Sequence, residues 1–215
     1  MTSDALIAEG QRLARPCVHL RTTGEPATLA AVWRGEGLVP PPGERYEHWL
    51  TIDCRFLPPN TGPSSGCLSV YTNDHDRDGA VAHSPSSSLS LARGGRPLYA
   101  HPTTSLPPLE AVFMHGSPAV AEWLASTGWH ANTIWDRRFP DRAVVQAYAD
   151  ALRANMPPDG ESVFAVLGGW HLSWPEGDWQ ELLDCPLIVL TLAESEPWVE
   201  AFSIDGGFRV IQRLS

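Results

Sequence analysis

The chain has 215 residues, of which 43% are hydrophobic and 19% are charged, a composition typical of a globular protein and not of a disordered one. Its formal net charge of −10 argues against nucleic acid as a direct ligand and favours a basic partner. Apolar residues never run on for the roughly eighteen positions that a membrane-spanning helix needs, so we expect no membrane partner.

Twenty prolines and eighteen glycines indicate many turns. The sequence therefore predicts one α+β domain over residues 1–215, built as a mainly antiparallel sheet with two or three packed helices. Met1–Asp4 has neither the cationic region nor the apolar core of a signal peptide. Together with four widely separated cysteines, this leads us to expect reduced thiols and a cytoplasmic location.

In the N-terminal half, the expected elements are a helix over 3–14 and strands over 17–21, 28–34, 46–56 and 67–72. Ser3 or Asp4 would cap the helix, and Gly10 would weaken it. Residues 46–56 alternate apolar and polar side chains, which is typical of a half-buried antiparallel strand. We expect them to form a hairpin with 67–72.

Residues 73–108 are predicted to be mostly loop, with 84–91 as a possible edge strand. Ser117-Pro118 begins a helix that Gly128 ends, and residues 140–155 form the strongest helical pattern. The remaining expected elements are a strand over 163–167, a helix after Pro175, and strands over 187–192, 198–204 and 208–214. Of these strands, 187–192 should be central, because it is apolar on both faces.

The net negative charge of the chain arises from one segment. Between Arg153 and Arg209 there are ten acidic residues and no lysine or arginine, whereas the rest of the chain has fifteen acids and fifteen arginines. This segregation is the strongest functional signal in the sequence, and it favours binding of a cationic partner.

Residues 74–79, Asp-His-Asp-Arg-Asp-Gly, match the first half of a calcium-binding loop, in which alternate carboxylates face one hard cation. The twelfth position is Pro85, which has no side-chain oxygen where a bidentate glutamate is required. A calcium-stabilised binding module remains an alternative. A solvated loop tip or an acidic contact with a partner, formed by Asp74, Asp76 and Asp78, is favoured over it.

No catalytic motif in the sequence occurs in the structural context that it requires. Gly62–Gly66 matches G-x-S-x-G, but prolines precede it and a strand follows it, unlike a nucleophile elbow. The eight histidines form no metal signature, so we expect no metal and no cofactor. A small hydrolase or transferase with His171, Cys185 and a carboxylate remains the enzyme alternative.

Several tryptophans gather near the C-terminus. Trp170, Trp174 and Trp179 flank a Gly-Gly turn and the acidic helix expected after Pro175. They either close the end of the sheet or anchor a partner, since exposed tryptophan beside charge is typical of binding hot spots. Trp33, Trp49, Trp123 and Trp198 lie in regular elements and are expected in the core.

The pattern Gly168-Gly-Trp-His171, Trp174-Pro175, Asp178-Trp179 and Glu196-Pro-Trp198 resembles immunity proteins of bacterial toxin systems, including those delivered by type VI secretion. The nearest family is immunity protein fifty-two, paired with restriction-endonuclease-like toxins. The resemblance covers 163–215 and implies an inhibitor that binds a cognate toxin.

We therefore expect an immunity protein that occludes the basic active site of a toxin, such as a nuclease, with an acidic surface. It would need no catalytic residue, and its oligomeric state is left open. The expected partner-binding residues, with the 74–78 loop as the weaker contact, are Trp174, Glu176, Asp178, Trp179, Glu181, Asp184, Asp74, Asp76 and Asp78.

Overall fold

The structure is a computed structural model of residues 1–215. It describes residues 1–73, 78–127, 141–155, 163–170, 185–191, 198–204 and 207–213, and all structural statements below concern these residues.

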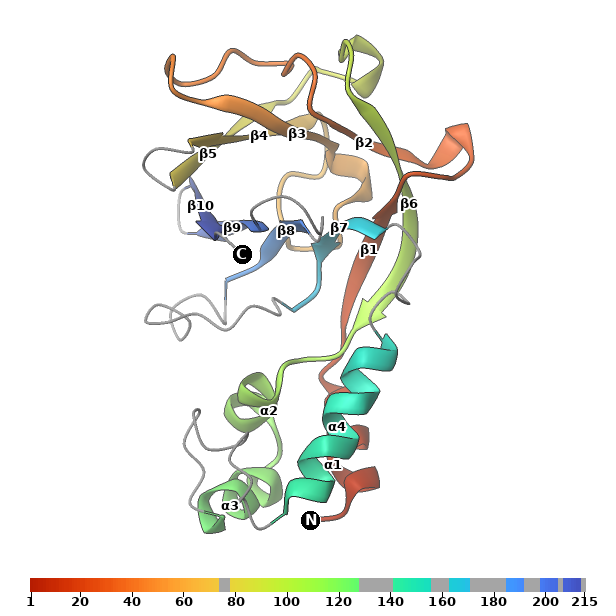
Figure 1. The fold of residues 1–215 in the computed structure, drawn as a ribbon, viewed down its shortest axis with the longest axis vertical. Helices are drawn as coiled ribbons and strands as arrows, with labels where there is room; N and C mark the ends of the chain where they lie inside the picture. Colours follow the sequence, from red (N-terminus) through yellow and green to blue (C-terminus); the bar gives the residue numbers. More distant parts are fainter. Residues whose placement is uncertain are drawn as a thin grey trace.

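The described strands form one ten-stranded sheet in the order β10-β9-β8-β7-β1-β6-β2-β3-β4-β5, and every neighbouring pair is antiparallel (Figure 1). The strands are β1 Arg15–Arg21, β2 Leu29–Trp33, β3 Glu47–Asp53, β4 Cys67–Asn73, β5 Asp78–Ser84, β6 Arg96–Ser105, β7 Val163–Gly168, β8 Leu187–Thr191, β9 Trp198–Ile204 and β10 Gly207–Arg213. With its helices this is an α+β fold, as predicted.

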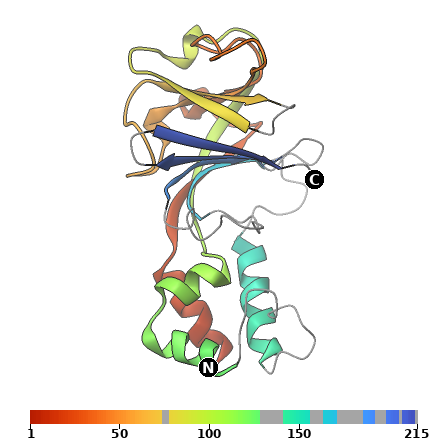
Figure 2. The same cartoon turned by 90° about the vertical axis from the view of Figure 1, so that its left-hand side faces the viewer.

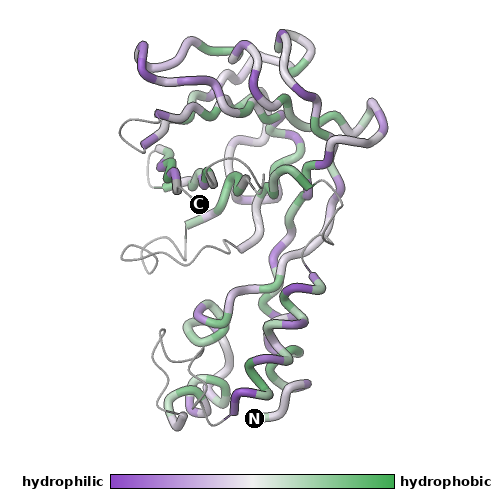
Figure 3. Tube along the Cα trace, viewed as in Figure 1, coloured by the Kyte–Doolittle hydropathy of each residue, from purple (hydrophilic) through white to green (hydrophobic). Residues whose placement is uncertain are grey.

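The sheet is strongly curled, so that its first and last strands come together (Figure 2). At this seam a Cβ atom added to Gly79 of β5 would lie 2.4 Å from Cγ1 of Val210 of β10. The largest hydrophobic core cluster lies on the inner side of the curl and includes Leu20, Leu50 and Val189. In Figure 3 the hydrophobic residues follow β7 and β8 closely.

The C-terminal strands agree with the prediction. β8 lies between β7 and β9 and is buried on both faces at Leu187–Leu190, and β9 and β10 form the expected hairpin. The predicted hairpin of β3 and β4 is also present.

Strand β6 contradicts the prediction of a loop-rich 73–108 region, because it is a ten-residue strand near the centre of the sheet. Its two prolines led to the error. Pro97 lies where β6 pairs only with β2, and Pro102 lies where it pairs only with β1. At each proline, β6 therefore has a neighbouring strand on one side only. On the other side the missing N–H of proline is tolerated, because no strand is there to accept a hydrogen bond from it. The edge strand of this region is Asp78–Ser84, not 84–91.

The prediction that β3 is half-buried is also wrong, because Trp49, Thr51 and Asp53 are buried as well as the apolar face. Two segments, one around Val39 and one around Leu89, cover the outer face of β3 and β4. The hydroxyl of Tyr71 donates to the carbonyl of Val39, and the neighbouring buried cluster joins Val32 and Cys67 to Leu89.

Four helices are described, more than the two or three expected: α1 Ser3–Arg12, α2 Leu109–His115, α3 Pro118–Ser126 and α4 Arg142–Asn155. They lie together beyond one end of the sheet (Figure 1) and share a separate core that contains Leu6, Leu124 and Tyr148. None of the described helices is long and apolar enough to cross a membrane.

Helix α1 differs from the prediction at its N-cap. Thr2, not Ser3 or Asp4, is its N-cap and accepts a hydrogen bond from the Ala5 amide at 3.3 Å. Gly10 is an adaptation for packing, because a Cβ atom there would lie 2.5 Å from the hydroxyl oxygen of Tyr148. Helix α2 was not predicted, since it begins directly after Pro107-Pro108.

Candidate functional site

The residues expected to bind a partner lie almost entirely outside the described residues. This holds for Trp174, Glu176, Asp178, Trp179, Glu181, Asp184, Asp74 and Asp76. The structure describes one of the expected contacts, Asp78, together with the residues that flank both stretches.

Asp78 is the exposed first residue of β5 and accepts a hydrogen bond from the Tyr46 hydroxyl at 3.1 Å. It pairs with Asn73 of β4, so a four-residue connection joins the two strands. Residues Asp78–Ser84, which would be positions five to eleven of a calcium loop, are a regular β-strand. This geometry does not fit the alternative of a twelve-residue calcium loop.

The acidic stretch 171–184 is joined to the sheet at Trp170 and Cys185. Trp170 follows a turn in which Gly168 and Gly169 have φ angles of +67° and +80°. Added Cβ atoms would meet Cγ of Pro58 at 2.5 Å and Oγ of Ser105 at 2.4 Å, respectively. Only glycine fits both the backbone conformation and the space at these positions.

Trp170 closes the end of the sheet and is 3% exposed, which favours the first of the two interpretations for this residue. Its amide donates to Oγ of Ser105 at 2.8 Å, and its indole N–H donates to the carbonyl of Leu13 at 3.0 Å. The guanidinium carbon of Arg15 lies 3.3 Å from the centroid of the indole ring. Trp170 also packs against Ala111 of α2, and thereby ties the sheet to the helices.

The described thiols bear on the enzyme alternative. Burial raises the pKa of Cys17 and Cys54 to about 12 and that of Cys67 to about 11, so that these three are protonated at neutral pH and poor nucleophiles. Cys185 is half-buried beside an apolar cluster with Leu187 and Phe202. Its suggested partner His171 lies outside the described residues.

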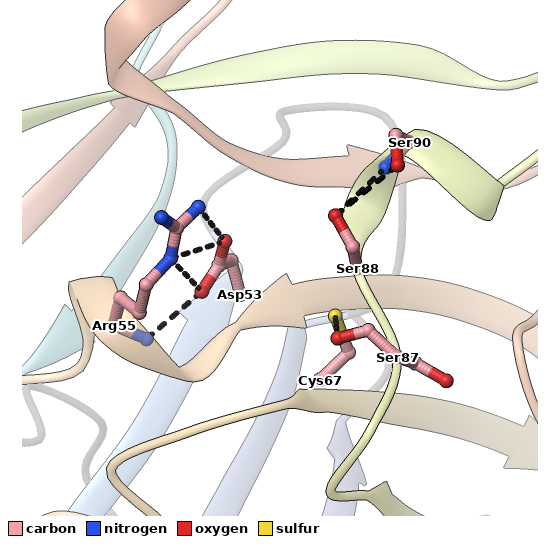
Figure 4. Close-up of polar contacts among 6 residues, drawn as sticks. All are labelled: Asp53, Arg55, Cys67, Ser87, Ser88 and Ser90. Carbon is pink, nitrogen blue, oxygen red and sulfur yellow. Dashed lines mark hydrogen bonds and ion pairs between the residues drawn. The ribbon is translucent and has the colours of Figure 1, made fainter.

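One ion pair stands at the end of β3. Figure 4 shows the Arg55 side chain beside Asp53, with Nη2 at 2.6 Å and Nε at 3.0 Å from Oδ2. The carboxylate is buried, whereas the arginine side chain is 72% exposed. In the same view the thiol of Cys67 donates to the carbonyl of Ser87 at 3.6 Å. These contacts stabilise the turn after β3 and the segment over β4, and they do not converge on a reactive atom.

Sequence reasoning missed a buried polar row on the outer face of β3 and β4. Nε2 of His48 lies 2.8 Å from Oγ1 of Thr51, which lies 3.1 Å from Oγ of Ser69. Thr51 and Ser69 are fully buried, so a substrate cannot reach these hydroxyls, and the row holds the two strands together. Simple alternation could not have revealed it, because the register of β3 shifts between His48 and Leu50 and so brings His48 and Thr51, three residues apart, to the same face.

A second polar feature lies on the outer face of the central strands, where His19 of β1 is directly opposite His101 of β6. The pKa of His19 is lowered by its burial and, to a smaller extent, by the nearby charges of Arg21 and His101. None of the residues of β1, β6 and β7 is an acid that could compensate a charged imidazole.

We therefore expect His19 to contribute to the pH dependence of the protein's stability. Its pKa is lower in the folded protein, so the unfolded chain binds more protons as the pH falls below the ordinary value of 6.5. The stabilising effect of a neutral His19 is complete above that value and is lost as the pH falls below it, by at most about 1.4 kcal/mol per pH unit. Urea unfolding of the wild type and His19→Gln at pH 7.5, 6.5 and 5.5 should show a shallower loss in the variant. Parallel pH profiles would contradict this assignment.

Comparisons with protein-family models, with curated proteins and with solved structures find no match to the chain. Among the described residues, no group of three or more histidine, cysteine, aspartate or glutamate side chains could hold a metal ion.

Proposed function

We propose that this chain is an immunity protein, which binds a cognate bacterial toxin in the cytoplasm and covers the toxin's basic active site with an acidic surface. The observation that carries the proposal is the segregation of charge, with ten acids and no lysine or arginine between Arg153 and Arg209. The resemblance of residues 163–215 to such proteins points the same way.

The fold adds support, because the segment between Arg153 and Arg209 supplies β7, β8 and β9, which lie next to one another in the sheet. Glu200, fully buried in β9, is its one acid among the described residues. The other nine acids lie in the segments that precede or join these strands. Strands that are mostly apolar therefore alternate with acidic connections, which suits a folded scaffold that presents carboxylates to a partner.

The chemistry of the partner follows from this charge. A nuclease needs cationic side chains to hold phosphate, and these side chains also attract carboxylates. An inhibitor with Glu176, Asp178 and Glu181 at that site excludes the substrate and associates quickly, because opposite charges steer the encounter. Trp174 or Trp179 would supply the apolar anchor typical of a hot spot. The 74–78 loop is a second contact in this proposal.

The test begins with the product of the gene next to this one, expressed with and without this chain. We expect the chain to protect cells from that product and the two proteins to elute together in gel filtration. Absence of both protection and complex for every basic neighbouring product would refute the proposed function.

Charge reversal tests the interface. Asp178→Arg combined with Glu181→Arg should weaken the complex about 10- to 100-fold, since each reversal replaces attraction by repulsion against a cationic site. The loss should shrink at high salt, where screening is stronger. Glu122→Arg, at an exposed position of α3, is the matched control and should change affinity little. A complex of unchanged affinity in the double variant would place the interface elsewhere on the chain.

A further inference from the structure

Two connecting segments form a flap over the outer face of β3 and β4. The flap consists of residues 36–45, between β2 and β3, and residues 85–93, between β5 and β6. The amide of Glu36 donates to the carbonyl of Arg93 at 2.9 Å, and the same two residues form an isolated β-bridge, so the two segments are joined to each other. Figures 1 and 2 show both segments beyond β3 and β4, at the end of the molecule opposite to the helices.

The flap is connected to β2 and β6 by a sharp bend in each segment. Arg34 and Gly35 have φ angles of +58° and +84°, and Gly94 and Gly95 have φ angles of +68° and +80°. A Cβ atom on Gly95 would lie 2.4 Å from the carbonyl oxygen of Arg34, so the two bends are in direct contact. The left-handed conformation is strained for Arg34, which has a Cβ atom, and such strain is typical of switch regions.

Few buried side chains hold the flap against the sheet. Among the flap residues whose burial the structure describes, only Leu89 is buried, and it belongs to a small cluster around Cys67 that is distinct from the largest core cluster. The hydroxyl of Tyr71 donates to the carbonyl of Val39, and the thiol of Cys67 donates to that of Ser87 (Figure 4). A segment with so few buried apolar contacts opens at a lower free energy than the sheet beneath it.

The flap covers polar groups on the outer face of the sheet. Cys67, Thr51 and Ser69 are at most 1% exposed, and the hydroxyl oxygens of Thr51 and Ser69 lie 3.1 Å apart. A Cβ atom on Gly37 would lie 2.5 Å from the hydroxyl oxygen of Tyr71, so glycine allows the flap to lie close to the strands. A weakly held segment over fully buried polar groups has the arrangement of a lid.

The other ends of the flap return to the sheet through exposed chain. Residues 40–45, which lead to β3, are all exposed, and so are residues 85–88, next to β5, except for the partly buried Ser87. Six and four residues of extended chain span at most about 20 and about 13 Å. Both stretches can therefore follow a movement of the flap while β3 and β5 stay paired.

We propose that the flap opens as a unit about the two bends, and so uncovers Cys67, Thr51 and Ser69 while the sheet stays folded. Closed, it separates a thiol and a row of hydroxyls from solvent. Open, it presents these groups at the surface. This movement is a property of the chain alone and does not depend on the proposed function.

The thiol of Cys67 reports the opening directly, because it lies under the flap. Cys54 is the matched control, since it follows the residue that pairs with Cys67 and is equally buried, but in the main core. The folded protein is treated with a maleimide, and peptide mass spectrometry measures the labelling rate of each cysteine. We expect Cys67 to react at least about tenfold faster than Cys54, since local opening costs less than global unfolding.

The same labelling is repeated at urea concentrations below the unfolding transition. The rate at Cys67 should change little, because opening of the flap exposes a small area, whereas the rate at Cys54 should rise steeply. Equal rates with equal urea dependence at the two cysteines would mean that only unfolding of the sheet exposes Cys67, and would overturn the proposal.

Tyr71→Phe keeps the aromatic ring but removes the hydroxyl that donates to Val39. The labelling rate of Cys67 relative to Cys54 should rise about 2- to 12-fold, which corresponds to the loss of one hydrogen bond. Tyr148→Phe is the matched control, because its hydroxyl donates to the Pro107 carbonyl among the helices, and it should leave this ratio unchanged. Because a general loss of stability raises both rates together, an unchanged ratio in Tyr71→Phe counts against the proposal.

Hydrogen exchange tests whether the two segments move together. The amide of Glu36 is bonded to Arg93 within the flap, so it stays protected when the flap opens as a unit. Its protection factor should exceed the protection of Cys67 against labelling at least about tenfold. Equal protection of the Glu36 amide and the Cys67 thiol would mean that the segments separate at every opening, and would refute movement as a unit.

Discussion

Replacing Trp170 with alanine is expected to lower the free energy of unfolding by about 3–5 kcal/mol, the usual cost of truncating a buried tryptophan. The ring is 3% exposed and lies where the sheet meets the helices. The substitution removes the indole donor to the Leu13 carbonyl and the face on which the Arg15 guanidinium stacks. Chemical denaturation of the two proteins measures the difference.

Trp170→Phe is the matched control for shape. It keeps an aromatic ring but loses the indole N–H, so it should cost much less than the alanine variant, with about 0.5–1.5 kcal/mol of its cost due to the lost hydrogen bond. A loss below 1 kcal/mol in Trp170→Ala would mean that this side chain does not join the sheet to the helices.

Gly168→Ala is expected to destabilise the protein by about 2–5 kcal/mol. A left-handed backbone costs a residue with a Cβ atom about 1–2 kcal/mol, and Gly168 has a φ of +67°. The added methyl group would also meet the Pro58 ring, whose Cγ lies 2.5 Å from the Cβ position, and crowding of this kind costs about 1–3 kcal/mol. Because the ring is rigid, a rotamer change cannot relieve the contact.

Gly207→Ala is the control for this substitution. Nothing lies within 4 Å of a Cβ atom at Gly207, and its φ is not in the left-handed region. Its stability should stay within about 1 kcal/mol of the wild type, as for most substitutions away from buried contacts. Equal effects of the two variants would show that the turn at Gly168 has no special conformational requirement.

Elements with a clear local period could be predicted from the sequence. Helix α4 has its apolar residues at helical spacing, and Val145 and Tyr148 of that stripe are buried. The continuous apolar run of β8 identified an interior strand, because a strand covered on both faces has no polar side.

The errors arose where long-range contacts override local signals. The prolines of β6 indicate a loop by composition, and only the arrangement of β1 and β2 explains why they fit. The polar residues of β3, such as Thr51, indicated a solvent-facing side, but Thr51 is fully buried and the segments around Val39 and Leu89 pack over this part of the sheet. An alternating pattern reports the chemistry of a face and not what packs against it.

For the candidate site, the sequence located the charge but not its surroundings. The segregation of acids could be counted without a structure. The role of Trp170 could not, because its partners Leu13 and Ser105 are far from it in the chain.

The pairing of β1 has a consequence for how the protein is made. On one side β1 pairs with β6, with Arg15 opposite Ser105, and on the other side with β7, with His19 opposite Val166. Both neighbours are synthesised long after β1, so a strand in the middle of the finished sheet has two open edges for most of translation. Proteins dominated by such distant pairings fold slowly and expose aggregation-prone edges meanwhile. Nascent chains that end before β7 should therefore need chaperones, and the C-terminal third that carries the acidic charge also completes the sheet.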